Sequence, residues 1–238
     1  TAFVNGFLQR NFPSGTNTLF FPVGDDNSYG PVTLTINNLS SDDQFRVRSW
    51  GTDHPQITNS DIIPSKSVNR YYGIDQNFNN SFTTADFSLE WEPSDVDGSA
   101  NTSNLSVSSY FSDASIWTIE SSSNSQPTSI DVSGITDFTD MFFQVGEAAS
   151  HVAGDYRTIN SGGWDNIAIW ETYNGASWIP ATVYPDASNA QTITIRSGHI
   201  TFPGNSSPLT LDQVVIDEGG EMKILEMQMT IADGPGTD

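Results

Sequence analysis

The segment 95–101 (Asp-Val-Asp-Gly-Ser-Ala-Asn) carries oxygen-bearing side chains at alternate positions around a central glycine. Calcium loops use this layout, because the cation takes about six to eight oxygen ligands and the chain must turn sharply around it. The bidentate glutamate expected further along is missing, so a simple Asp/Gly turn between strands is the alternative. Asp95, Asp97 and Asn101 are therefore candidate calcium ligands, and residues 24–27 (Gly-Asp-Asp-Asn) are a weaker candidate of the same kind.

The tryptophans offer a second kind of chemistry, because sugars stack on exposed aromatic faces. Aromatic side chains also fill the cores of β-sandwiches. Trp91 alternates with Phe87 and Leu89, so we expect it in a core. Trp178 lies beside Tyr173 on a predicted hairpin, and we expect this pair to be an exposed ligand or interface site. The remaining tryptophans are Trp50, Trp117, Trp164 and Trp170.

Residues for catalysis are hard to find. His54, His151 and His199 lie far apart and show neither HxxxH nor HExxH spacing, and no GxSxG, P-loop or GxGxxG motif occurs. Glu90 and Glu92 flank a tryptophan in an alternating run, so both are expected to face solvent. With 29 acidic residues, some carboxylate pair lies close by chance, and no single pair indicates sugar hydrolysis. The sequence predicts no catalytic residue and no cofactor other than the calcium candidate.

The charge balance excludes several partners. Eight basic and 29 acidic residues give a net charge of −21. A field of that sign repels phosphate, so binding to nucleic acid or to anionic membrane surfaces is disfavoured. The absence of cysteine excludes disulfides and thiolate metal sites. No apolar run is long enough for a transmembrane helix, so membrane insertion is not expected.

Alternating apolar and polar residues dominate the first part of the chain. Residues 32–36, 45–48 and 87–91 each place apolar side chains at every second position, as half-buried strands do. About eight or nine such runs, separated by turn residues, predict an antiparallel β-sandwich. The polar stretch 121–129 is expected to be a loop between two late strands. The alternation fails at 146–154, which predicts a sandwich domain over 1–149 and a second domain over 150–238.

The second part reads as a hairpin followed by short β-runs. Asn174-Gly175 predicts a type I′ turn that sets Glu171 opposite Trp178 and Tyr173 opposite Ala176, so that Tyr173 and Trp178 are diagonal neighbours. The later runs are typical of the rungs of a β-solenoid. A solenoid needs a cap or a continuation, so we expect the natural chain to extend past residue 238. The runs are residues 192–195, 209–211, 214–216, 222–224 and 227–231.

Several segments resemble a known group of proteins. Residues 3–10 (FVNGFLQR), 21–25 (FPVGD) and 142–147 (FFQVGE) resemble a module of large secreted proteins of Bacteroidetes, which are substrates of type IX secretion. Residues 161–164 (SGGW) and 193–199 (ITIRSGH) resemble a companion module. The resemblance covers most of the chain, and its motifs are structural rather than catalytic.

This resemblance implies a β-sandwich module followed by a β-solenoid-like module, with Trp164 and Trp170 capping the solenoid. It implies an extracellular or cell-surface location, export with a C-terminal sorting domain outside this sequence, and roles in adhesion, surface layers or filaments. Lys66 and Arg70 stand in the module's K-S-V-x-R motif, to which no chemical role is attached.

The sequence therefore predicts a non-enzymatic structural or adhesive surface protein. Its expected partners are copies of itself, as in a filament or surface layer, or neighbouring modules of a longer chain. Strand addition at residues 1–8 or 227–231 would provide the contact. The alternative is a carbohydrate-binding accessory region of a secreted polysaccharide-degrading protein. An enzyme, such as a lyase on a β-helix, ranks last because too few rungs are present to form a long cleft.

Overall fold

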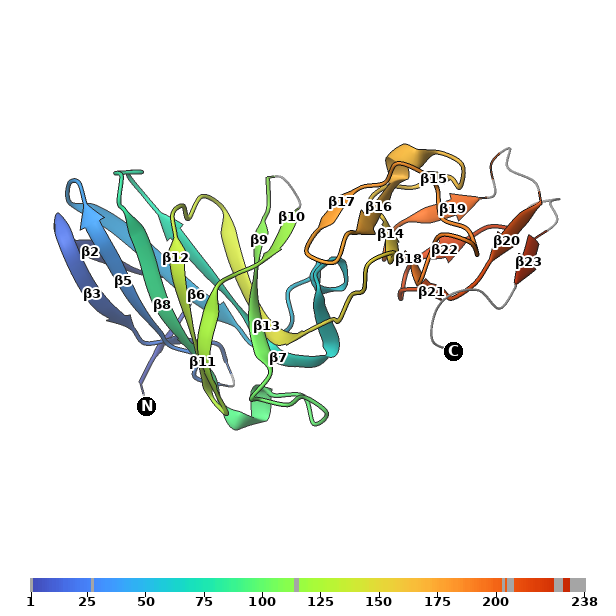
Figure 1. Ribbon diagram of the computed structural model, residues 1–238. Coiled ribbons are helices and arrows are strands. Elements are labelled where there is room, and N and C mark those ends of the chain that lie inside the picture. Colours follow the sequence, from blue (N-terminus) through green and yellow to red (C-terminus); the bar gives the residue numbers. More distant parts are fainter. Residues whose placement is uncertain are drawn as a thin grey trace. The chain divides into compact units, whose positions relative to one another are not determined.

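The computed structural model describes residues 2–26, 28–113, 116–202, 204, 208–224 and 229–231 (Figure 1). The chain divides into two compact units, residues 1–149 and 150–238. Both are built from β-strands, as predicted, and the helical residues are short 3-10 turns. Among the described residues, no helix has the length and apolar character needed to cross a membrane. The turns are η1 (Ile57–Asn59), η2 (Pro93–Asp95) and η3 (Ile167–Ile169).

Unit 1 is a sandwich of two antiparallel sheets (Figure 1). The six-stranded sheet has the order β10-β9-β13-β7-β6-β2 and the five-stranded sheet the order β11-β12-β8-β5-β3. The six-stranded sheet contains β2 (Leu8–Phe12), β6 (Asp43–Trp50), β7 (Ile62–Gln76), β9 (Leu105–Phe111), β10 (Ile116–Ile119) and β13 (Met141–Ala148). The five-stranded sheet contains β3 (Gly15–Phe21), β5 (Val32–Leu39), β8 (Thr84–Glu90), β11 (Ser122–Gln126) and β12 (Ser129–Ile135), and β1 (Val4–Asn5) pairs in parallel with β4 (Val23–Gly24).

The core of unit 1 follows from alternation along these strands. Val32, Leu34 and Ile36 of β5 are fully buried, while the intervening threonines lie on the opposite side of the sheet. Phe45 and Val47 of β6 face them from the other sheet and belong to the same core cluster. This burial of alternate side chains confirms the predicted sandwich and fixes which face of each strand is left outside.

Two expectations for unit 1 are wrong. Within the segment 121–129, β11 pairs with β12 as an edge strand, because a polar run can still satisfy its backbone in a ladder. Glu90 is half-buried and its pKa is raised by loss of solvent, whereas Glu92 is exposed as predicted. Trp91 lies in the core, as expected, and its indole Nε1 donates to the Pro127 carbonyl oxygen at 3.0 Å.

Unit 2 is a short parallel solenoid, as predicted (Figure 1). Ile193 pairs with Val214 and Ile200 with Glu221, so corresponding residues of the last two rungs are 21 positions apart on the first two faces. The first face stacks β14 (Tyr156–Thr158), β18 (Ile193–Ile195) and β21 (Val214–Ile216). The second stacks β15 (Gly162–Gly163), β19 (Ile200–Phe202) and β22 (Glu221–Met222), and the third pairs β20 (Leu209–Leu211) with β23 (Met229–Ile231).

A hairpin of β16 (Trp170–Tyr173) and β17 (Trp178–Pro180) pairs antiparallel with β14 at the first rung. Trp170 of this hairpin and Trp164 are both fully buried, and their ring centroids are 4.7 Å apart. The predicted register of this hairpin is wrong, because Tyr173 pairs directly with Trp178. A type I′ turn needs positive φ at both central residues, but only Gly175 of the pair has one, +95°. The turn is held instead by the Asn174 side-chain oxygen, which accepts hydrogen bonds from the backbone N–H groups of Ala176 and Ser177.

Candidate binding face

The proposed calcium loop uses its carboxylates inside the protein. Asp95 accepts from the Nε of the fully buried Arg70 at 3.0 Å. Asp97 accepts from the backbone N–H of Ser67 at 2.9 Å. The Asn101 side-chain oxygen accepts from the backbone N–H two residues later and so closes its own turn. These oxygens already have protein donors, so the loop offers few free ligands for a cation.

Metal binding therefore has no geometric support in unit 1. Over the described ranges, no group of three or more histidine, aspartate or glutamate side chains is close enough to hold an ion. In the weaker candidate, Asp25 contacts Arg70 at 2.9 Å and Asp26 accepts from Asn5, while Asn27 lies outside the described residues. Calcium stays a prediction without a site.

The predicted Tyr173 and Trp178 pair is real but is not an open platform. Their ring centroids are 5.4 Å apart, in an edge-to-face arrangement. The Arg157 guanidinium lies 4.1 Å from the centroid of the Trp178 ring, and the His151 ring lies 4.8 Å from it. Both aromatic side chains are half-buried by these neighbours. The Arg157 guanidinium therefore covers one face of the Trp178 ring.

A different aromatic surface lies on the outer side of the six-stranded sheet. Every strand of this sheet contributes one aromatic ring, the first from the residue just before β2. We call this surface the aromatic face. It consists of Phe7, which directly precedes β2, and of Trp50, Tyr71, Phe142, Tyr110 and Trp117, from β6, β7, β13, β9 and β10 respectively.

The rings of the aromatic face form two groups, one around Trp50 and one of Tyr110 with Trp117, and the His54 ring joins them. Trp50 and Tyr71 stack in parallel, with centroids 4.5 Å apart and an interplanar angle of 3°. Trp50 also touches Phe142 at 5.9 Å and Phe7 at 5.8 Å. Phe7 is 44% exposed, and Trp50, Tyr71 and Phe142 are half-buried. Large rings that stay partly open on the outside of a sandwich are typical of recognition surfaces.

Gly73 of β7 makes the close approach of these rings possible. A Cβ atom at this position would lie 3.1 Å from the Trp50 ring and 3.4 Å from Phe142. The absence of a side chain lets both rings lie across the middle of the sheet, where they cover the exposed backbone of the strand. Gly73 is therefore a structural requirement of the aromatic face.

A loop with His54 covers the end of this surface formed by β9 and β10, and the His54 ring also contacts Tyr71 and Phe142. The Gln144 side chain accepts from the His54 backbone N–H at 2.8 Å and donates to Asp53, which fixes the loop to the sheet. The His54 ring is 5% exposed and lies between Tyr110, at 4.7 Å, and Trp117, at 5.1 Å. Burial lowers the pKa of His54 to about 4, so the ring is neutral near pH 7.

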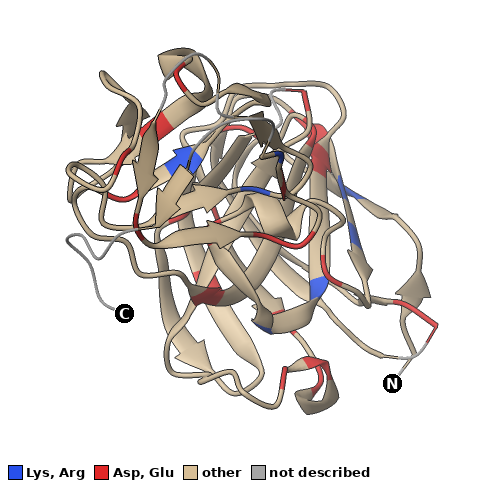
Figure 2. Cartoon of the chain, turned by 90° about the vertical axis from the view of Figure 1, so that its right-hand side faces the viewer, with Lys and Arg blue, Asp and Glu red and all other residues tan. Residues whose placement is uncertain are grey.

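Polar groups border the other end. Arg46 and Arg48 lie on the same side of β6 as Trp50, and the Arg48 guanidinium is 4.6 Å from the Trp50 ring centroid. Arg46 bonds to Asp75, whereas Arg48 has no carboxylate partner among the described residues. Its Nε is buried without a hydrogen-bond partner. Figure 2 shows how few basic positions the chain has among its many acidic ones.

Amides extend the polar border. Gln44 of β6 accepts from Gln9 of β2 at 2.7 Å and from Asn77 at 3.0 Å. All three are at least partly exposed, so their remaining donors and acceptors are open to a ligand. The outer side of the sheet thus combines stacked rings, amides and one arginine without a carboxylate partner.

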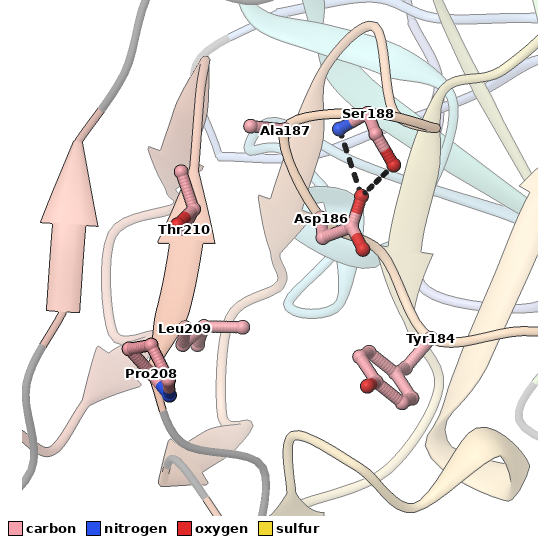
Figure 3. Close-up of a pocket in the computed structure, with 7 residues that line it drawn as sticks. All are labelled: Tyr184, Asp186, Ala187, Ser188, Pro208, Leu209 and Thr210. Atoms are coloured by element: carbon pink, nitrogen blue, oxygen red, sulfur yellow. Dashed lines mark hydrogen bonds between the residues drawn. The ribbon is translucent and has the colours of Figure 1, made fainter.

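Unit 2 also has a shallow pocket of about 310 Å³ (Figure 3). Tyr184, Asp186 and Leu209 lie around it, and Figure 3 shows Ser188 turned toward the carboxylate. Asp186 accepts from the Ser188 backbone at 2.7 Å and from its hydroxyl at 2.6 Å, which closes the turn at this point. The hydrogen bonds give the carboxylate a local structural role, so we place no function here.

Sequence reasoning missed the aromatic face because its members are far apart in the chain. From the sequence, Trp50 and Trp117 are singled out only as tryptophans, and Tyr71 is not singled out. The available signal was alternation: Arg46, Arg48 and Trp50 occupy every second position next to the buried Phe45 and Val47. That pattern places an arginine pair and a ring together on the outside of one strand.

Comparisons with known protein families, with curated proteins and with solved structures find no match to this chain.

Proposed function

We propose that this chain is an extracellular, non-enzymatic adhesive protein that binds polysaccharide through the aromatic face of unit 1. The observation that carries the proposal is the group of rings on the outer side of the six-stranded sheet, in which the His54 ring joins the stack of Trp50 and Tyr71 to the rings on β9 and β10. Sugars present apolar C–H faces that stack on such rings, and their hydroxyls bond to neighbouring amides. Gln9, Gln44 and Asn77 stand where those hydroxyls would be.

A flat surface suits a long chain better than a small molecule. Small ligands are held in concave pockets that bury most of their surface. The aromatic face is a sheet surface, and it crosses the strands from β10 to β2. A polysaccharide can lie along it and touch several rings at once.

Arg48 favours an acidic polysaccharide over a neutral one. It is a cation on the binding surface without a carboxylate partner in the described part of the chain, in a protein of strong net negative charge. A uronic acid carboxylate would supply the missing partner and form a charge-assisted hydrogen bond. The same cation would attract anionic ligands toward the aromatic face despite repulsion from the rest of the chain.

The sequence properties agree with this proposal. A cysteine-free, acidic chain with many Asn, Ser and Thr residues suits an extracellular surface, and the resemblance to secreted proteins of Bacteroidetes points the same way. The neighbouring modules of a longer protein would then be the other partners of the two units. Calcium has no part in the proposed binding, because the side-chain oxygens of Asp95, Asp97 and Asn101 already accept from donors of the protein itself.

Isothermal titration calorimetry with soluble polysaccharides tests the proposal. A neutral glucan and a polyuronate should be compared for the wild type, Trp50→Ala and Arg48→Gln. Trp50→Ala should weaken binding about 10-fold or more, since a stacked ring contributes about 1–3 kcal/mol in comparable stacking sites. Arg48→Gln should weaken binding of the polyuronate only.

Trp178→Ala is the matched control, because this tryptophan also stacks with an arginine but lies in unit 2. It should leave both affinities unchanged. Binding of neither polymer by the wild type, or equal binding by wild type and Trp50→Ala, would overturn the proposal. If Trp178→Ala alone lost binding, the site would be the hairpin predicted from the sequence.

A further inference from the structure

The outer side of β6 changes its chemistry along the strand. Gln44, Arg46, Arg48 and Trp50 occupy every second position and are at least partly exposed, while the residues between them are buried. Because the side chains of a strand alternate between the two sides of a sheet, these four lie in one line on the outside. The line begins with an amide, continues with two cations and ends with an aromatic ring. A ligand that lies along β6 would meet these groups in turn.

The strands on both sides of β6 show the same change. At one end, Tyr71 of β7 pairs with Trp50 and stacks on it. At the other end, the side-chain amide of Asn77, just past the end of β7, donates to the Gln44 side-chain oxygen at 3.0 Å, and Gln9 of β2 donates to the same oxygen at 2.7 Å. Gln44 and Trp50 are six residues apart, which corresponds to about 20 Å along a strand, or about four units of an extended sugar chain.

Toward β9 and β10 the same surface is covered. The His54 ring is 5% exposed and Tyr110 is 9% exposed, and their ring centroids are 4.7 Å apart. The Trp117 indole Nε1 donates to the Gln56 carbonyl oxygen at 3.0 Å, so the loop with His54 also holds this ring. A long ligand in contact with Trp50 therefore has more open surface along β6 than toward β10.

A further aromatic side chain follows just beyond the amide end. Phe78 comes directly after Asn77 and is 59% exposed. The loop that carries it is held by the carboxylate of Asp43, which is 1% exposed and accepts from the backbone N–H groups of Phe78 at 3.0 Å and Asn80 at 2.9 Å. The Gln76 side chain donates to the same carboxylate at 2.8 Å. A buried carboxylate with these donors fixes the loop, so the exposed ring is presented in a defined place.

We propose that an acidic polysaccharide lies along β6, from the stack of Trp50 and Tyr71 to Phe78, and that Phe78 is an aromatic contact at the far end of the site. This path rests on the proposed function and specifies how its ligand is held. A uronate carboxylate in the middle of the path binds Arg48. Sugar hydroxyls bond to the amides around Gln44, and the apolar side of the last sugar packs on Phe78.

The path predicts how binding depends on the length of the ligand. A disaccharide reaches only one end of it, whereas a chain of about four units contacts the stacked rings at one end and Phe78 at the other. The affinity for oligouronates should therefore rise up to about four to six units and then stay constant, because further units lie outside the path. Phe78 contributes its contact only to the longer chains.

Isothermal titration calorimetry with oligouronates of increasing length, from the dimer to the octamer, tests the path. Phe78→Ala should weaken binding of the octamer about 5-fold or more, as the loss of one stacked ring does in comparable sites, and should leave binding of the dimer unchanged. Phe20→Ala is the matched control, because Phe20 is 43% exposed but lies on β3 of the other sheet. Ile119→Ala, which changes a 41% exposed side chain on β10, should also leave every affinity unchanged.

Three results would overturn the path while the proposed function stands: Phe78→Ala binds the octamer as tightly as the wild type does; the affinity is already constant from the dimer onward; or Ile119→Ala weakens binding, which would mean that the ligand crosses the strands toward β10. A wild type that binds no oligouronate and no polysaccharide would overturn the proposed function as well. Should circular dichroism show that Phe78→Ala is misfolded, Asn77→Ala decides, because it removes an exposed amide from the same end of the path and should weaken binding of the octamer only.

Discussion

Acidification should weaken unit 1 through His54, which is buried as a neutral ring under the aromatic face. Loss of solvent lowers the pKa of His54 from 6.5 to about 4 in the folded protein. Above pH 6.5 the ring is neutral in both states and contributes no pH dependence. Between pH 6.5 and 4 the unfolded chain takes up a proton that the folded protein does not, so stability falls.

The size of the effect follows from the pKa difference. One pKa unit corresponds to about 1.4 kcal/mol, so a change from 6.5 to about 4 removes at most about 3 kcal/mol of unfolding free energy by pH 4. Protonation would also turn Nδ1 from an acceptor into a donor, and this atom accepts from the Gln56 backbone N–H at 3.1 Å. The loop that closes the aromatic face should therefore loosen as His54 becomes charged.

Urea unfolding of the wild type and His54→Phe at several pH values measures the contribution of His54 to the free energy of unfolding. The carboxyl groups of Asp53 and Glu90 have raised pKa values, so their protonation increases the free energy of unfolding on acidification, opposite to the effect of His54. Both proteins contain them, so they cancel in the difference between the two curves. The wild type should lose about 3 kcal/mol relative to His54→Phe between pH 7.5 and pH 4.

NMR titration of the His54 ring gives an independent check. The folded protein should show a midpoint near pH 4. A midpoint near 6.5, or two stability curves that run parallel across this range, would refute the burial argument. Polysaccharide binding, in turn, should be constant from pH 7.5 to about 5.5, where the neutral ring still holds the loop.

The other predictions concern packing. Arg70→Ala should destabilise unit 1 by about 3–5 kcal/mol in urea unfolding, because it leaves the carboxylate of Asp95 buried without its ion partner; a loss below about 1 kcal/mol would contradict this. Gly73→Val should leave unit 1 folded but weaken polysaccharide binding, because the new side chain displaces the Trp50 ring; unchanged affinity would count against the role of that ring. Trp164→Ala should cost unit 2 about 3–5 kcal/mol, visible by calorimetry, while the transition of unit 1 is unchanged.

Much of the fold was readable because alternation reports burial directly. Val32, Leu34 and Ile36 identify a strand and its inner face from the sequence alone, since side chains of a strand alternate between the two sides of a sheet. Short apolar runs indicated the rungs of unit 2, whereas the 21-residue spacing of β18 and β21 comes from the structure. The polar edge strand β11 was missed because its side chains bury little, and only the backbone ladder with β12 makes it a strand.

The candidate sites show the limit of local reasoning. Asp95 and Asp97 looked like metal ligands because spacing along a loop says nothing about Arg70, which comes from β7 and bonds to Asp95. The predicted hairpin register made Tyr173 and Trp178 diagonal neighbours, but the two residues pair directly, because the Asn174 side chain reshapes the turn. In both cases the deciding contact was outside the local pattern.

The sequence alone determined the β class, the alternating strands of unit 1, the short β-runs of unit 2 and the acidic charge, since these depend on composition and on the periodicity of neighbouring residues. Only the tertiary structure decided which side chains meet. Trp50, Tyr71 and Phe142 are brought together by strand order and register, which pair β6 with β7 and β7 with β13. Pairing between distant strands depends on the packing of the whole sandwich, and that is why the aromatic face could not be found from the residues one segment at a time.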